Sequence, residues 1–142
     1  MLIAMYIIYN CVYALAAYPI GIYADKVGFK KMVAGGIFIF SIVYGMFALN
    51  TNAVINIILL ILYGLYAAAT ESTAKAWITK SVEKQNTAAA IGTFTGFQSI
   101  ALFFASTITG IVWYKYGSAV ALASSAIAAL LIAIFIWFKV EE

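Results

Sequence analysis

Long apolar segments without charge alternate along this chain with short polar ones. Residues 1–24 carry no charged side chain, and neither do residues 32–49. About 20 apolar residues are enough for a helix to cross the hydrocarbon core of a bilayer. The pattern predicts five such helices, at residues 2–24, 32–49, 53–72, 87–113 and 118–138.

The continuity of these segments favours helices over a barrel. Backbone polar groups in lipid must bond within the protein, which a helix achieves by itself. A transmembrane barrel would need short segments that alternate apolar and polar residues. The expected fold class is therefore all-α: a polytopic membrane helix bundle with five transmembrane helices, in a single transmembrane domain over residues 1–142.

Composition excludes a soluble domain. The chain is 66% hydrophobic and 9% charged, whereas soluble domains average about 45–50% apolar and about 25% charged residues. So few polar groups could not cover the surface of a soluble globule. A lipid bilayer is the first expected partner, and the basic excess of +3 belongs to connections beside the membrane rather than to a nucleic-acid site.

Residues suited to catalysis are scarce. There is no histidine, which removes the commonest acid–base group and metal ligand. The single cysteine, Cys11, cannot form a disulfide within the chain and is interpreted as a small buried residue. The few acids are scattered, so the sequence predicts no metal site, no cofactor and no enzyme.

The lysines predict an orientation. Short cytoplasmic connections are enriched in Lys and Arg. Lys115 lies in the fourth connection, whereas the other lysines lie in the first or third connection or after the last span: Lys26, Lys30, Lys31, Lys75, Lys80, Lys84 and Lys139. We therefore expect a multi-pass protein of the cytoplasmic membrane, with its C-terminus inside the cell and its N-terminus outside.

One polar connection carries a recognisable motif. From Gly21 to Lys31 the chain reads Gly-x-x-x-Asp-x-x-Gly-x-Lys-Lys between two apolar segments. This pattern resembles the loop signature of the major facilitator superfamily of secondary transporters. The resemblance implies two halves of six helices each, built from inverted three-helix repeats, and transport by alternating access.

The resemblance also implies that the chain is part of a longer protein. An outside N-terminus without a polar segment, and an odd number of helices, indicate at least one missing upstream helix. The third span has no arginine, and the fourth lacks a Gly-Pro-x-x-Gly-Gly type motif. These features favour helices eight to twelve of the C-terminal half, from a fragment or an incomplete gene model. The missing N-terminal half and a small-molecule substrate are then expected partners, with a proton as the candidate coupling ion.

Residues of the motif suggest a gate. Gly21 would let another helix approach closely, and Gly28 would permit a positive φ in the turn. The resemblance implies that Asp25 accepts hydrogen bonds from the start of a neighbouring helix, here near residues 86–88, with Lys84 as the nearest cation. The alternative is a solvated aspartate that caps its own turn.

Three further charged residues have two interpretations each. Lys30 and Lys31 are expected to anchor the topology against anionic lipid, each attraction being worth about 1 kcal/mol, or to join the gate. Glu71 is an acid within the third span, where ionisable residues are functional candidates by default. Lys75 lies four residues further on, a spacing that suits a local helical ion pair, and we favour this structural or gate role over proton transfer.

Polar stripes predict which spans face a cavity. Asn10 and Tyr13 share a face of the first span, Ser99 belongs to a hydroxyl stripe on the fourth span, and Gln98 lies beside it. We expect these four side chains to line the cavity, together with polar residues of the third span. The second and fifth spans have few polar residues and are expected to face lipid. The alternative is that the small polar residues only hold helices together.

These features together predict a secondary active transporter of a small solute. The alternative is an integral membrane protein that does not transport: a scaffold or a subunit of a membrane complex. A membrane enzyme is the least favoured class.

Overall fold

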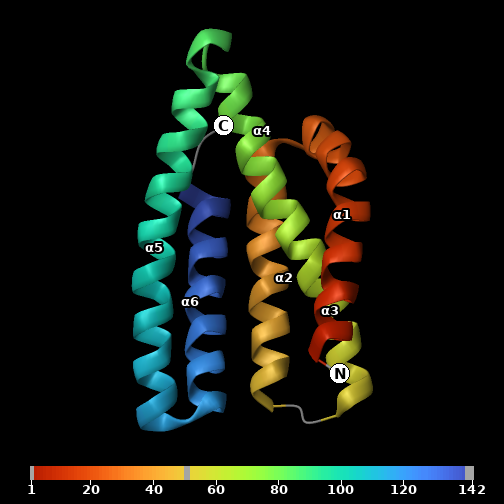
Figure 1. The fold of residues 1–142 in the computed structure, drawn as a ribbon, viewed down its shortest axis with the longest axis vertical. Helices are drawn as coiled ribbons and strands as arrows, with labels where there is room; N and C mark the ends of the chain where they lie inside the picture. Colours follow the sequence, from red (N-terminus) through yellow and green to blue (C-terminus); the bar gives the residue numbers. More distant parts are fainter. Residues whose placement is uncertain (1, 50–51, 140–142) are drawn as a thin grey trace.

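The computed structural model describes residues 2–49 and 52–139, which form a bundle of long helices (Figure 1). Its elements are α1 (Leu2–Val27), α2 (Phe29–Leu49), α3 (Ala53–Ala67), the π-helix η1 (Ala68–Ser72), α4 (Thr73–Ser81), the 3₁₀-helix η2 (Lys84–Asn86), α5 (Thr87–Tyr116) and α6 (Ser118–Lys139). Within the described ranges, five stretches are long and apolar enough to cross a membrane, and α3, η1 and α4 together make one of them. The predicted all-α bundle of five spans is confirmed.

The helices run further than the apolar segments that predicted them. The first helix includes Asp25 and Lys26, and the third span remains helical as far as Ser81. Hydropathy marks the part of a helix that lies in lipid, whereas Ala and Lys continue a helix into water with little penalty. The second predicted connection begins at Asn50 and Thr51, which lie outside the described residues.

The polar turn expected around residues 25–31 is much shorter than predicted, because Gly28 alone separates α1 from α2. Gly28 has φ 99°, a left-handed conformation that glycine adopts without the steric cost of a Cβ. Its N–H donates to Ala24 O at 3.0 Å, and its own carbonyl accepts from Met32 N at 3.2 Å. Backbone hydrogen bonds therefore continue through the joint from α1 into α2.

Two groups of helices meet along α2 (Figure 1). The most extensive interface joins α2 to α6, with α5 lying against α6, while α3 packs against both α1 and α2. The Gly28 joint, η2 and the end of α6 lie at one end of the bundle, opposite the N-terminus and Gly117. We call the first the lysine-rich end, because Lys26, Lys30, Lys31, Lys80, Lys84 and Lys139 lie in η2 or in the helix ends that meet there.

Small residues form most of the core. The buried apolar side chains besides Val43 and Leu59 are alanines: Ala24, Ala34, Ala67, Ala68, Ala69, Ala121, Ala126, Ala129 and Ala133. Lipid tails are as apolar as leucine, so membrane helices associate by close packing and hydrogen bonds, and small residues allow their backbones to approach. Ser41 adds such a bond, donating from Oγ to Ala126 O at 2.8 Å across the α2–α6 interface.

Gly64 marks the closest approach of α3 to α1. A Cβ added there would lie 2.9 Å from Val12 Cγ1 and 3.2 Å from Tyr9 O. We expect Gly64→Ala to destabilise the bundle by about 1–3 kcal/mol, the usual cost of overpacking, as measured by thermal unfolding of the purified chain in detergent.

Gly45→Ala is the matched control, because its Cβ would meet Ala126 Cβ at an ordinary 3.9 Å. This variant should be neutral or more stable, since alanine is favoured over glycine in a helix by about 0.5–1 kcal/mol. Equal stability changes in the two variants would show that the α1–α3 contact is not tight.

Candidate functional site

Three helices meet at the lysine-rich end through four side chains, which we call the junction cluster: Asp25, Phe29, Trp77 and Lys80. Lys80 Nζ of α4 lies 2.7 Å from Asp25 Oδ1 of α1. The same ammonium lies 5.2 Å from the centroid of the Phe29 ring at the start of α2. Phe29 and Trp77 stack with centroids 6.2 Å apart and planes 9° apart. The cluster thus ties α4 to both helices of the Gly28 joint.

The ion pair of this cluster is weak enough to break. The side chains of Lys80 and Asp25 are 55% and 50% exposed. Exposed ion pairs contribute only about 0.2–1 kcal/mol, because water competes for both charges. The pair can therefore favour one arrangement of the helices at this end without locking it.

The partner of Asp25 corrects a prediction. Its ion pair is with Lys80, rather than with the start of α5 near residues 86–88 or with Lys84. The difference arises because α4 continues the third span beyond its apolar part and carries Lys80 back over α1. A signal was present in the sequence: Trp77 and Lys80 are three residues apart, so a helix over Thr73–Ser81 places both on one face.

Other motif residues lie on helices rather than in a loop. Gly21 belongs to α1, and a Cβ built there meets no atom within 4 Å among the described residues. The close helix approach expected at Gly21 is therefore not found among the described residues, where it occurs instead at Gly36 and Gly64. Lys30 and Lys31 lie in the first turn of α2, where Lys31 is exposed.

Glu71 and Lys75 form the local ion pair expected from their spacing. Lys75 Nζ lies 2.8 Å from Glu71 Oε1, and the side chains are 42% and 40% exposed. Glu71 belongs to η1, a single π-helical turn between α3 and α4. The carboxylate of Glu71 is therefore partly exposed, and its charge is balanced by an ammonium one turn further along the span.

The π-helical turn itself was not predicted. Thr70 Oγ1 donates to Tyr66 O at 2.9 Å, and Ser72 Oγ donates to Ala68 O. Such bonds from hydroxyls to the preceding turn bend helices, and π-turns often occur at functional sites. Thr73 Oγ1, just beyond, is buried with no hydrogen-bond partner among the described residues. The third span therefore has a local irregularity where Glu71 lies.

A large cavity opens between α2, α3, α5 and α6, and we call it the central cavity. Its volume is about 960 Å³. The wall formed by α2 and α3 is aromatic and contains Phe40, Tyr44, Tyr63 and Tyr66. The wall formed by α5 and α6 carries the hydroxyls of Ser106, Thr109, Ser124 and Ser125. None of the described residues that line it is charged. Such a site suits a solute held by ring contacts and hydroxyl hydrogen bonds.

The four side chains predicted to line a cavity lie elsewhere. Asn10 Nδ2 donates to Tyr6 O of its own helix at 2.8 Å, and Ser99 Oγ donates to Thr95 O at 2.9 Å. Tyr13 and Gln98 are likewise absent from the lining of the central cavity. These four residues therefore lie off the central cavity, whereas Ser106 and Thr109, from the same hydroxyl stripe of the fourth span as Ser99, line it.

The aromatic wall was predicted only in part: the third span was expected to help line the cavity and does so through Tyr63 and Tyr66, whereas Phe40 of α2 was missed. Phe40 and Tyr44 of α2 have ring centroids 4.0 Å apart, and Phe40 lies 4.8 Å from Tyr66 of α3. Tyr63 lies 5.4 Å from Tyr66. Tyr44, Ser124 and Ser125 come from the two spans that were expected to face lipid, so part of each of these spans faces the cavity instead. The sequence signal was their polar groups within otherwise apolar helices.

One side of the bundle is left open. No residue of α5 is buried against the rest of the described chain, although the helix is long enough to span a bilayer. The described residues contain no group of three or more His, Cys, Asp or Glu side chains placed to hold a metal ion.

Five apolar spans, an uncharged cavity and a charged joint between helices define a multi-pass helical membrane protein with features of a transporter. The family model described as Major Facilitator Superfamily matches residues 1–142. An uncharacterized MFS-type transporter of Methanocaldococcus jannaschii is 33% identical over 129 residues, which cover 86% of this chain and 32% of the relative. The chain belongs to the major facilitator superfamily.

The chain thus spans about a third of the length of the curated relative it matches. No solved structure matches it with significance.

A double-mutant cycle tests the ion pair of the junction cluster. Because the pair is half exposed, we expect Asp25→Asn and Lys80→Gln to show a coupling of about 0.2–1 kcal/mol in the free energy of unfolding. Asp25→Asn combined with Lys115→Gln is the control, since Lys115 lies at the opposite end, and its effects should add. Additive effects in the Asp25–Lys80 cycle would mean that the contact contributes no stability.

Proposed function

We propose that this chain supplies helices eight to twelve of a secondary active transporter that moves a small solute across the cytoplasmic membrane by alternating access. The observation that carries the proposal is the 2.7 Å ion pair between Lys80 and Asp25, since Asp25 belongs to the stretch that resembles the superfamily's loop signature. It joins two spans at one end of the bundle by a contact weak enough to form and break in each transport cycle.

The junction cluster is the proposed inner gate. Cytoplasmic connections are enriched in lysine, which supports placing the lysine-rich end in the cytoplasm and the N-terminus of this chain outside. Asp25, held at the Gly28 joint, would then keep α1 and α4 together while the transporter is closed on the inside. Gly28 shapes the joint, Lys30 and Lys31 anchor it, and Gly21 is left for a helix of the rest of the transporter to approach.

The central cavity is the proposed solute path. Transporters of this kind bind substrate near the bilayer midplane between their repeats. The hydroxyls of Ser106 and Thr109, together with the ring of Tyr66, supply uncharged contacts there. The unburied surface of α5 supports an interface with the rest of the transporter, so the N-terminal half is the proposed partner.

Glu71 is the acid available to a coupling proton in this part of the protein. Its ion pair with Lys75 supports the structural role instead, because proton transfer would require that pair to separate. A proton remains the proposed coupling ion, taken up elsewhere in the transporter.

Neutralising the gate should change transport more than abundance. In the full-length transporter we expect Asp25→Asn to alter the rate of solute transport into proteoliposomes by up to about fivefold, the factor that corresponds to about 1 kcal/mol for an exposed pair. Lys80→Gln should act in the same direction, and the double variant should resemble either single one. Lys115→Gln, at the other end of the bundle, is the matched control.

Protein abundance in the membrane separates the possible outcomes. Transport and abundance falling together in Asp25→Asn would leave this residue a structural one. Wild-type protein that binds but never moves any solute would instead favour a scaffold or subunit of a membrane complex.

The structural role of Glu71 gives a separate prediction. We expect Glu71→Gln to keep transport and its dependence on a pH gradient, while losing only about 0.3–0.5 kcal/mol of stability, the worth of a helical i,i+4 pair. The pH dependence of transport in proteoliposomes measures this. Transport that no longer responds to the pH gradient would make Glu71 the proton carrier.

A further inference from the structure

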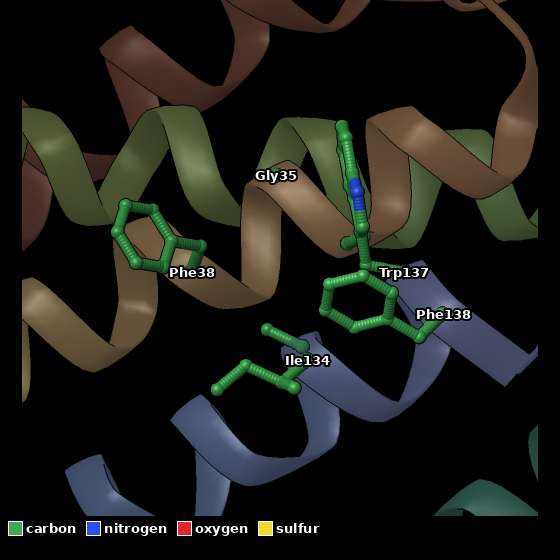
Figure 2. Close-up of a pocket in the computed structure, with 7 residues that line it drawn as sticks. Gly35, Phe38, Ile134, Trp137 and Phe138 are labelled. Carbon is green, nitrogen blue, oxygen red and sulfur yellow. The ribbon is translucent and has the colours of Figure 1, made fainter.

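A second, smaller cavity lies between α2 and α6, away from the Asp25 pair. It is a groove of about 200 Å³. Figure 2 shows Phe38 and Trp137 on either side of Gly35, with Phe138 projecting from α6 nearby. None of its lining residues belongs to α3 or α5, so it is distinct from the central cavity. We call it the α2–α6 groove.

The floor of the α2–α6 groove is made of small residues and its rim of large ones. Ala34 and Ala133 are 2% and 5% exposed, whereas Phe38 and Phe138 are 49% and 78% exposed. A Cβ built at Gly35 meets no atom within 4 Å, which shows open space above the floor. The groove is therefore a slot bounded by rings, and every residue that lines it is apolar.

The volume of the groove limits what can fill it. One turn of an α-helix about 10 Å wide and 5.4 Å high encloses about 420 Å³, roughly twice the groove. A helix from another chain could cover the groove but not enter it. A single lipid acyl chain is thinner and flexible, and acyl chains are what surround an exposed apolar surface in a bilayer.

A positive charge lies about one helical turn before the groove on α2. Lys31 precedes Gly35 by four residues and Phe38 by seven on α2, so all three lie on one face of that helix. Lys31 is exposed and lies at the lysine-rich end, with Lys30 beside it. Trp137 lies near the end of α6, and tryptophan is enriched at the level of lipid headgroups.

We propose that the α2–α6 groove binds one anionic phospholipid. Its acyl chain lies over Gly35 between Phe38 and Trp137, and its phosphate group is held by the ammonium of Lys31. The groove supplies shape and Lys31 supplies charge complementarity, so the site distinguishes lipids by their headgroup. The lipid would couple α2 to α6 on the outer face of the bundle, independently of the solute path.

Native mass spectrometry of the purified chain tests the site. After delipidation, the chain is titrated with phosphatidylglycerol or with phosphatidylcholine, which share acyl chains and differ in headgroup charge. We expect one phosphatidylglycerol to remain bound at activation energies that remove phosphatidylcholine. Lys31→Gln should weaken this retention about fivefold, the factor that corresponds to about 1 kcal/mol per lysine. Lys115→Gln should leave it unchanged.

Filling the groove should abolish the site. Gly35→Leu places a side chain in space that is open in the protein, so we expect a folded variant that retains no phosphatidylglycerol. Gly92→Leu is the control, because a Cβ at Gly92 also meets nothing within 4 Å and lies on α5. If Gly35→Leu fails to fold, Lys31→Gln still tests the proposal.

A direct readout places the acyl chain. With Trp77→Phe and Trp113→Phe, Trp137 is the remaining tryptophan, and phosphatidylglycerol with brominated acyl chains should quench its fluorescence more than brominated phosphatidylcholine. Equal retention and equal quenching by both lipids would overturn the proposal. So would retention that survives Gly35→Leu, or a dimer that Gly35→Leu dissociates, because the groove would then be covered by a second copy of the chain.

Discussion

The rest of this structure depends on the requirement that backbone hydrogen bonds be satisfied without water. In lipid an unpaired N–H or C=O costs several kcal/mol, so a spanning segment must be helical. The chain meets this requirement so fully that Gly28 alone interrupts the path from α1 to α2, and even there hydrogen bonds continue on both sides. Within the described residues, the proposed gate and the central cavity accordingly form where continuous helices meet, rather than in loops.

Helices in lipid gain no hydrophobic driving force from one another, and the core reflects this. Its buried side chains are mostly alanines, and Gly36 and Gly64 bring neighbouring backbones into contact. Close packing at these positions leaves the large aromatic side chains to surround open space. That division produces both the central cavity, with its ring cluster of Phe40, Tyr44, Tyr63 and Tyr66, and the narrower groove over Gly35.

Most of the charge lies near the ends of the spans, and the Glu71–Lys75 pair lies within the third span. The Asp25–Lys80 pair is half exposed, so it stabilises one arrangement by little and can exchange its partner for water. The irregular turn η1, with Glu71, lies in the same span as Lys80. One span of the described chain thus carries the lysine of the proposed gate, a π-helical turn and two rings of the cavity wall.

The sequence by itself determined the solvent, the number of spans, the family and the Glu71–Lys75 pair, because each depends on composition or on spacing within one helix. It did not determine that Lys80 meets Asp25, that Asn10, Tyr13, Gln98 and Ser99 lie outside the central cavity, or that α2 and α6 help to line it. Those facts depend on where each helix ends and how it is rotated against its neighbours. Only the tertiary structure decided them, because periodicity defines a face but not its direction, and hydropathy marks membrane depth but not the end of a helix.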